Sequence, residues 1–503
     1  SIMAPPETTK PGPEAPTLNR EKWIVPKKEK LSYFIGAGSH FTVHTFMSSF
    51  LAAYLLMIGV TPAVSAVVLL VLKAWDAIND VLFGYFIDKI RFKPGKSKLL
   101  GWFFSGRYLP WYRIAALILP FSTIIMFTVN TDAPVWVRVL QYALGYLLYD
   151  TAFTLSSAPY GCMLTSLTSN VNERNFLQSY SVLGQGLGSL PVMFIGTVLI
   201  AGSFGYSGAA ILFAVFGFLI AIPAMTLIKE RIISAPAPAP EQQYPLKEMV
   251  SFLKKTKEFL FFQLGQLIWG MFYTTAFGLF VAFYIFGDAN ISLILLAAAV
   301  IPTIAILPFF PLIFKRVNKI TAIRIACVVY FVTGLTIYFL GPEFLKSSMG
   351  LFVVLAGIGG FSNAFVLIGS AMLLPDIAEM AKYRTRAEHV GIIFSIHAFV
   401  QKLVASLVTS VTLLILGAYG YVSVTANSFE ELAALNAQGI GLQTPRALQG
   451  LWDVSYLFPA LGFGLAALFF VLVKIDRRQV HTVIQANLGE ITREEAEAQL
   501  AAH

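Results

Sequence analysis

Charged residues are scarce in this sequence and cysteines are almost absent. Only 13% of its 503 residues are charged, against about 25% in a typical soluble domain, whereas 57% are hydrophobic and the mean hydropathy is +0.72. So few charges cannot cover a water-facing surface, which excludes most soluble globular proteins. Cys162 and Cys327 lie in apolar runs, which excludes a disulfide framework, and six scattered histidines form no recognisable metal motif. The composition predicts a protein of the lipid bilayer.

Long hydrophobic stretches recur along the chain, each near the twenty residues that a helix needs to cross the bilayer. They predict an all-α membrane protein with twelve transmembrane helices. The predicted spans are 32–58, 63–88, 110–130, 135–164, 176–201, 206–228, 258–286, 291–315, 322–341, 347–375, 389–418 and 451–474.

A proline-rich segment, Ser234–Pro240, separates the sixth span from the seventh. Its prolines cannot continue a helix, so it predicts a linker between two six-helix bundles. An even helix count divided by such a linker is the arrangement of major facilitator transporters. The predicted divisions are a disordered cytoplasmic N-terminal tail (1–30), an N-terminal bundle (31–228), a cytoplasmic linker (229–257), a C-terminal bundle (258–474) and an amphipathic cytoplasmic C-terminal tail (475–503).

The basic residues predict the orientation of the chain, because Lys and Arg accumulate on the cytoplasmic side of short loops. If the N-terminal tail is cytoplasmic, its side of the membrane carries nearly all of them, and the opposite side keeps Arg138, Lys346 and Arg446. Both termini are therefore predicted to be cytoplasmic. The same distribution explains the net charge of +9 by topology, which argues against a nucleic-acid partner.

The second span contains three charges, Lys73, Asp76 and Asp80, at helical spacing on one face. A charge inside the bilayer costs roughly 2.5–3.5 kcal/mol, so each indicates a function. Two carboxylates one turn apart repel each other unless a cation or a proton lies with them. The pattern predicts a cation site, with an internal salt-bridge network as the structural alternative.

Polar side chains also occur in the fourth and eleventh spans. Asp150, Thr154 and Ser157 share a face of the fourth, and Lys402 interrupts the apolar eleventh. If the halves face each other, Lys402 can approach the second-span acids as their counter-charge. Carboxylate and hydroxyl oxygens suit sodium, whereas a pair of like-charged acids suits a proton, so both ions stay open. For Asp150 the alternative is a helix-packing role.

Candidates for a substrate pocket are polar or aromatic residues within the spans. His40 is one of them, although a buried neutral histidine bonded to a backbone carbonyl is the favoured interpretation. Gly184 and Gly188 form a GxxxG, for which close helix packing is the favoured interpretation. The six pocket candidates are Lys73, His40, Tyr149, Asp150, Ser157 and Tyr180.

The string WDAIND at Trp75–Asp80, followed by Gly84, is the most specific motif. With the matches below, it resembles the signature of the glycoside, pentoside and hexuronide cation symporters, the melibiose-permease-like branch of the major facilitator superfamily. The resemblance covers nearly the whole chain in order. The further matches are Gly106–Trp111, Pro159–Tyr160, Glu173–Arg174, Arg386–Glu388 and Lys402.

The resemblance implies a cation site formed by Asp76, Asp80, Thr154 and Lys402, with the first three as the sodium ligands if the ion is not a proton. It does not carry over the sugar site, because the positions of the family's galactoside-binding side chains hold other residues. A sugar needs several fixed hydrogen-bonding groups in a dry site, and few remain there. Those positions hold Phe41, Ser157, Gly161 and Val182.

The expected function is therefore secondary transport: symport of a sugar, glycoside or related small solute with sodium or a proton, by alternating access. The alternative is sodium-coupled symport of an amphipathic lipid such as a lysophospholipid. A membrane enzyme or a non-transporting receptor is disfavoured, since no nucleophile, metal set or nucleotide loop is present. We expect no cofactor besides the coupling ion, a monomer, and a bacterial inner membrane as the location.

Overall fold

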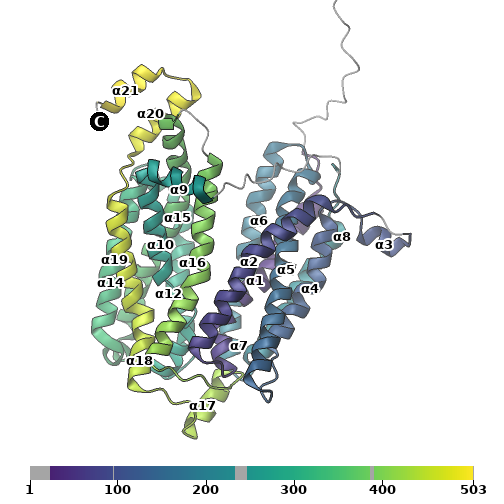
Figure 1. Ribbon diagram of the computed structural model, residues 1–503, viewed down its shortest axis with the longest axis vertical. Helices are drawn as coiled ribbons and strands as arrows, with labels where there is room; N and C mark the ends of the chain where they lie inside the picture. Colours follow the sequence, from purple (N-terminus) through teal and green to yellow (C-terminus); the bar gives the residue numbers. More distant parts are fainter. Residues whose placement is uncertain (1–22, 94–95, 233–245, 386–389, 502–503) are drawn as a thin grey trace, which may run out of the picture.

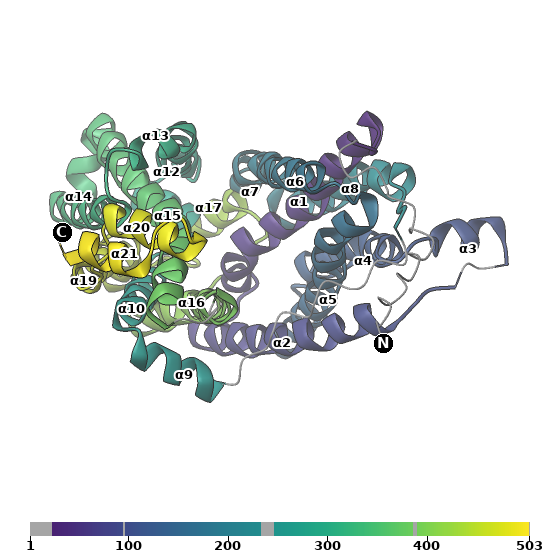
Figure 2. The ribbon, with the colours of Figure 1, turned by 90° about the horizontal axis from the view of Figure 1, so that it is seen from above.

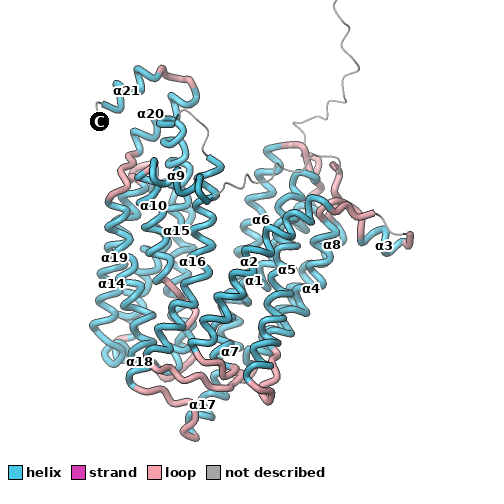
Figure 3. Tube along the Cα trace, in the orientation of Figure 1, coloured by secondary structure: helices cyan, strands magenta, loops and turns pink. Residues whose placement is uncertain are grey.

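The computed structural model describes residues 23–93, 96–232, 246–385 and 390–501. Within these ranges the secondary structure is helical and no strand occurs (Figure 3). Three parts of the sequence discussed above lie outside these ranges: residues 1–22 of the predicted tail, residues 233–245 of the predicted linker and the Arg386–Glu388 match.

The first half of the chain forms six long helices within the described residues. α2 begins with Pro62 directly after Thr61, a position where the missing N–H of proline costs nothing. The short α3, Lys98–Phe103, lies outside the bundle and is capped by the Ser97 hydroxyl. The six are α1 (Lys27–Met57), α2 (Pro62–Lys89), α4 (Leu109–Phe127), α5 (Val135–Leu167), α6 (Val171–Pro191) with η1 (Val192–Gly196) and α7 (Thr197–Ala201), and α8 (Gly205–Leu227).

The second half also forms six long helices within the described residues, and two of these helices are broken. Non-helical backbone separates α10 from α11 at residues 273–277, and α14 kinks at Gly341, where φ is +74°. The six are α10 (Lys257–Phe272) with α11 (Gly278–Phe280) and η2 (Val281–Ile285), α12 (Ile291–Ile306) with η3 (Leu307–Phe309) and α13 (Phe310–Phe314), α14 (Lys319–Ser347), α15 (Met349–Thr385), α16 (Val390–Ala418), and α18 (Pro445–Trp452) with η4 (Asp453–Leu457) and α19 (Phe458–Val471).

Among the described residues, eight helical segments are long and apolar enough to cross a membrane by length and composition alone. The other four predicted spans are α1, α2, α5 and the broken segment from α10 to η2. The segment from α10 to η2 falls short because its helices are interrupted at residues 273–277, whereas α2 carries the charges Lys73, Asp76 and Asp80. Two of the four, α2 and α5, carry residues of the candidate site.

The two halves form separate bundles that lie side by side (Figures 1 and 2). They diverge at the end that carries α9 (Leu246–Lys255) and α20 (Arg477–Leu488), and they converge at the end that carries α7, α17 (Phe429–Ala437) and α18. We call these the tail end and the closed end. Across the interface, α2 of the first bundle packs against α16 of the second.

A strap, residues 419–428, ties the halves together at the closed end. It connects α16 to α17 and crosses the first bundle, where the Ala426 N–H donates to the Met57 carbonyl at 2.8 Å. The Arg138 guanidinium donates to the Ile58 carbonyl at 2.8 Å and to the Thr425 hydroxyl at 3.0 Å. Buried apolar side chains of both halves form one continuous cluster there. The closed end is thus sealed by backbone, side-chain and apolar contacts.

α1 and α6 approach so closely that glycine is required between them. A Cβ on Gly184 would lie 2.2 Å from the Phe34 carbonyl oxygen, and one on Gly188 would lie 2.3 Å from that of Gly38. Even alanine would therefore force the helices apart. The prediction that Gly184 and Gly188 serve helix packing is confirmed.

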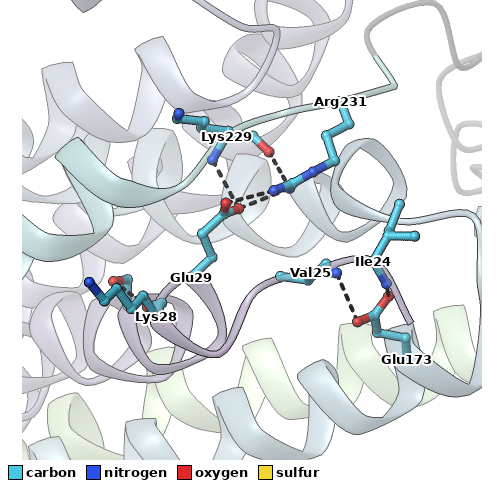
Figure 4. Close-up of polar contacts among 8 residues, drawn as sticks. Ile24, Val25, Lys28, Glu29, Glu173, Lys229 and Arg231 are labelled. Atoms are coloured by element: carbon cyan, nitrogen blue, oxygen red, sulfur yellow. Dashed lines mark hydrogen bonds and ion pairs between the residues drawn. The ribbon is translucent and has the colours of Figure 1, made fainter. Parts of the chain in front are cut away.

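At the tail end, the first bundle is fastened by carboxylates (Figure 4). Glu29 pairs with Arg231 at 2.6 Å, so α1 starts four residues before the predicted boundary and holds the chain that leaves α8. Glu173 is fully buried, accepts from the N–H groups of Ile24 and Val25 at 3.0 and 3.1 Å, and pairs with Lys30 at 2.8 Å.

Replacing Glu173 with glutamine is expected to destabilise the protein by about 1–3 kcal/mol, because an amide NH₂ would face a buried backbone donor and the ion pair would be lost. Thermal unfolding in detergent would show this as a lower melting temperature. Glu497→Gln, at an exposed position of α21 (Arg493–Ala501), is the matched control. Equal melting temperatures for the two variants would contradict the role given to Glu173.

The C-terminal segment forms α20 and α21, which pack on the tail end of α15 in the second half. The Asn487 amide donates to the Glu379 carboxylate at 2.8 Å, and Val480 and Val483 are buried. This segment therefore belongs structurally to the second bundle.

Candidate functional site

Asp80 is the point where three membrane helices meet. α2 places its carboxylate between α5 and α16, where Oδ1 accepts from the Thr154 hydroxyl at 3.1 Å and Oδ2 pairs with the Lys402 ammonium at 2.5 Å. The Asp80 and Lys402 side chains are 35% and 59% exposed, so protein atoms do not fully enclose the ion pair. Three of the four residues predicted for the cation site are brought into contact, and they come from both halves of the chain.

Asn79 completes this arrangement. It is fully buried, and its amide donates to the Thr154 hydroxyl at 3.0 Å and accepts from the Thr151 hydroxyl at 3.2 Å. The Thr154 hydroxyl proton is therefore free to point at Asp80. Asn79 was not among the predicted site residues, although an amide within the WDAIND string of an apolar span indicates a role.

Asp76 lies in a second charged group beside Asp80. Asp150 lies near Asp76, Lys73 and Asp80, so the charges of these four residues are close to one another. Asp150 is only 5% exposed, and its Oδ2 has no hydrogen-bond partner among the described residues. Lys73 lies over the Tyr146 ring, with Nζ 5.6 Å from its centre.

Together the two groups contain three carboxylates, those of Asp76, Asp80 and Asp150, and two ammonium groups, those of Lys73 and Lys402. This excess of negative charge at membrane depth favours a bound cation or proton. In the described part of the chain, no three acidic, histidine or cysteine side chains converge as metal ligands. A sodium ion would therefore need neutral oxygens such as those of Thr154 and Asn79 besides the carboxylates.

The remaining pocket candidates form no common polar site, although the rings of His40 and Tyr149 both pack against Phe153. The His40 ring bonds to the Gly36 carbonyl at 3.0 Å and is buried, which confirms its structural interpretation. Tyr149 bonds to His44 at 2.6 Å. Tyr180 stacks on Phe34 at 4.5 Å between ring centres, and Ser157 is half-buried.

A cavity of about 490 Å³ lies between the halves, away from all six pocket candidates. The first half contributes residues near Ser49 of α1 and Thr197 of α7, and the second contributes the break at 273–277 with parts of α12, α14, α15 and η4. This cavity could not be predicted from the sequence, because its hydroxyl residues are ordinary ones in apolar spans and no periodicity marks them.

The chain is similar to known membrane transporters. The family model described as MFS/sugar transport protein matches residues 33–477. The isoprimeverose transporter of Lactiplantibacillus pentosus is 24% identical over 91% of this chain and 90% of its own. A sodium-dependent lysophosphatidylcholine symporter of Gallus gallus is 24% identical over 78% and 79%.

Among solved structures, a nucleoside transporter, NupG, matches with a TM-score of 0.60 at 13% identity, over 89% of this chain and all of the other. These matches confirm the predicted fold, a multi-pass membrane protein with twelve helices in two six-helix bundles.

Proposed function

Because this chain belongs to the MFS/sugar transport protein family, and is a transporter rather than an enzyme, we propose that it is a cation-coupled symporter of a sugar, glycoside or related small solute. The observation that carries the proposal is the contact of Asp80 with Thr154 in its own half and with Lys402 in the other. A charged link between the two moving bodies is what coupling needs.

The proposed mechanism follows from competition for one carboxylate. The Asp80 carboxylate cannot form a full ion pair with Lys402 while it also binds a cation. Sodium or a proton at Asp76 and Asp80 therefore weakens the ion pair that joins α2 to Lys402 of α16. This shifts the equilibrium between the two arrangements of the halves, and a solute that prefers the same arrangement raises the affinity for the ion. Each ligand therefore promotes binding of the other.

We further propose the orientation, state and location of the protein. The tail end faces the cytoplasm, since the basic residues gather there, so both termini are cytoplasmic and the cavity is reached from inside. The protein works as a monomer in a bacterial inner membrane and needs no cofactor besides the coupling ion.

The test is transport by the purified protein in liposomes, with radiolabelled isoprimeverose as the first solute and an inward sodium gradient, an inward proton gradient or neither. We expect accumulation above equilibrium with one of the gradients alone, and that arm identifies the ion. Equal uptake in all three conditions would show that transport is not coupled to a cation.

An amphipathic substrate is the second candidate, and one observation favours it. Phe41, at a position of the family's galactoside ligands, packs with His44 and Phe153, whose rings are 4.2 Å apart. Such an aromatic cluster presents apolar surface that an acyl chain can pack against. Displacement of a bound solute by glycosides but not by lysophosphatidylcholine would argue against this candidate.

A further inference from the structure

The cavity between the halves has the size and position of a ligand site. Its volume of about 490 Å³ falls within the range of roughly 300–1,000 Å³ that small-molecule pockets occupy. Both halves line it, so a molecule inside would contact both moving bodies. α2 and its carboxylates do not line it, so a solute there would not compete with the cation for the same groups.

The described residues that line the cavity include no acidic, basic or histidine side chain, and many of them carry hydroxyl groups. Six of these hydroxyls have no hydrogen-bond partner among the described residues, so each can donate a hydrogen bond to a ligand and accept one from it. They come from five separate helices or breaks and converge on one space. The six are Ser49, Thr275, Thr409, Tyr273, Tyr330 and Tyr456.

The phenols are held in place by aromatic packing. Tyr330 stacks on Phe463 with ring centres 3.7 Å apart, and Tyr273 packs against both rings at 6.1 and 5.9 Å. Their hydroxyls are therefore positioned before any ligand arrives, which lowers the entropic cost of binding.

The break between α10 and α11 points to the same space. Residues 273–277 are not helical, although they lie within a segment that crosses the membrane. Such backbone is tolerated at membrane depth where it lines a cavity, and broken helices commonly form the binding sites of transporters. Thr274 and Thr275 of the break both line this cavity.

We propose that this cavity binds the uncharged, polyhydroxylated part of the solute, so that the transporter accepts neutral sugars or glycosides and rejects anionic ones. The inference rests on the proposed function and specifies its substrate class. A carboxylate or sulfonate inside would lose its hydration without meeting a positive charge, whereas unpaired hydroxyls can replace the water around a neutral sugar.

The test compares two probes that differ at one carbon, p-nitrophenyl β-glucoside and p-nitrophenyl β-glucuronide, alongside isoprimeverose. Equilibrium binding is measured on the full-length protein in detergent with saturating sodium at constant pH. We expect a neutral probe to bind at least about tenfold more tightly than the glucuronide. Equal or tighter binding of the glucuronide, or binding of no neutral probe, would overturn the proposal.

Thr409→Val and Tyr273→Phe remove one hydroxyl each with little change of shape. Each is expected to weaken binding of the neutral probe by about fivefold or more. Thr336→Val is the control, since Thr336 is exposed on α14, bonds to the Val332 carbonyl of its own helix and does not line the cavity. Unchanged affinity in both cavity variants, with melting temperatures equal to the control, would also overturn the proposal.

Binding in detergent needs no ion gradient, so this outcome is separate from that of the transport test. Selective binding of the glucoside without gradient-driven accumulation would reject cation coupling and keep the cavity assignment. Coupled transport of a glucuronide would keep cation coupling and reject the cavity assignment.

Discussion

Replacing Asp80 with asparagine is expected to abolish solute accumulation driven by a cation gradient. The change removes the carboxylate that contacts both Thr154 and Lys402. The Asp80 and Lys402 side chains are 35% and 59% exposed, so the ion pair itself contributes only about 0.2–1 kcal/mol to stability. The loss of accumulation comes instead from the missing negative charge, because an amide attracts a cation far less than a carboxylate does. Uptake with and without the gradient measures the effect.

Two further variants separate coupling from stability. Glu343→Gln breaks an exposed ion pair with Lys346 and should leave accumulation unchanged. The double variant Asp80→Asn/Lys402→Gln removes both charges, so it should regain thermal stability without regaining accumulation. If the double variant accumulates solute normally, the pair is a structural salt bridge and the coupling role is wrong.

Locking the closed end is expected to stop transport completely. Alternating access requires the halves to separate where the strap joins them. A Cβ at Gly59 would lie 3.9 Å from the Cβ of Thr425, within the usual 3.5–4.5 Å of a disulfide. Oxidised Gly59→Cys/Thr425→Cys should therefore show only background uptake, and a reducing agent should restore it.

The single variants are the controls for this experiment. Gly59 has φ of +78°, so a cysteine there costs about 1–2 kcal/mol whether or not a disulfide forms. Gly59→Cys and Thr425→Cys alone should transport under oxidising conditions at the rate of their reduced forms. Normal uptake by the oxidised double variant, with the disulfide verified on a non-reducing gel, would show that the closed end need not open.

The sequence predicted the features that depend on few residues at short spacing. Charges in an apolar helix are costly and conspicuous, so Asp80 and Lys402 could be identified, and helical spacing with the family resemblance added Thr154. The structure brings these three residues into contact. Long apolar stretches likewise predicted the helices and the division into two bundles.

The features that depend on packing between distant segments could not be predicted in this way. The cavity hydroxyls come from several helices of both halves, and no local pattern distinguishes them from other Ser, Thr and Tyr residues in apolar spans. The start of α1 at Lys27 depends on Arg231, about two hundred residues away, which pairs with Glu29. From the sequence alone, the charged residues at the start of α1 are therefore assigned to a solvated tail.

The tail-end anchors also bear on how the protein is made. Glu29, Lys30, Glu173 and Arg231 fasten the first bundle only to itself. Once Arg231 has left the ribosome, every partner of these contacts has been synthesised, whereas the strap has not. Because domains fold as units during synthesis, the first bundle can reach its final packing in the membrane before the second exists. The strap, which is synthesised later, then closes onto a surface that is already packed.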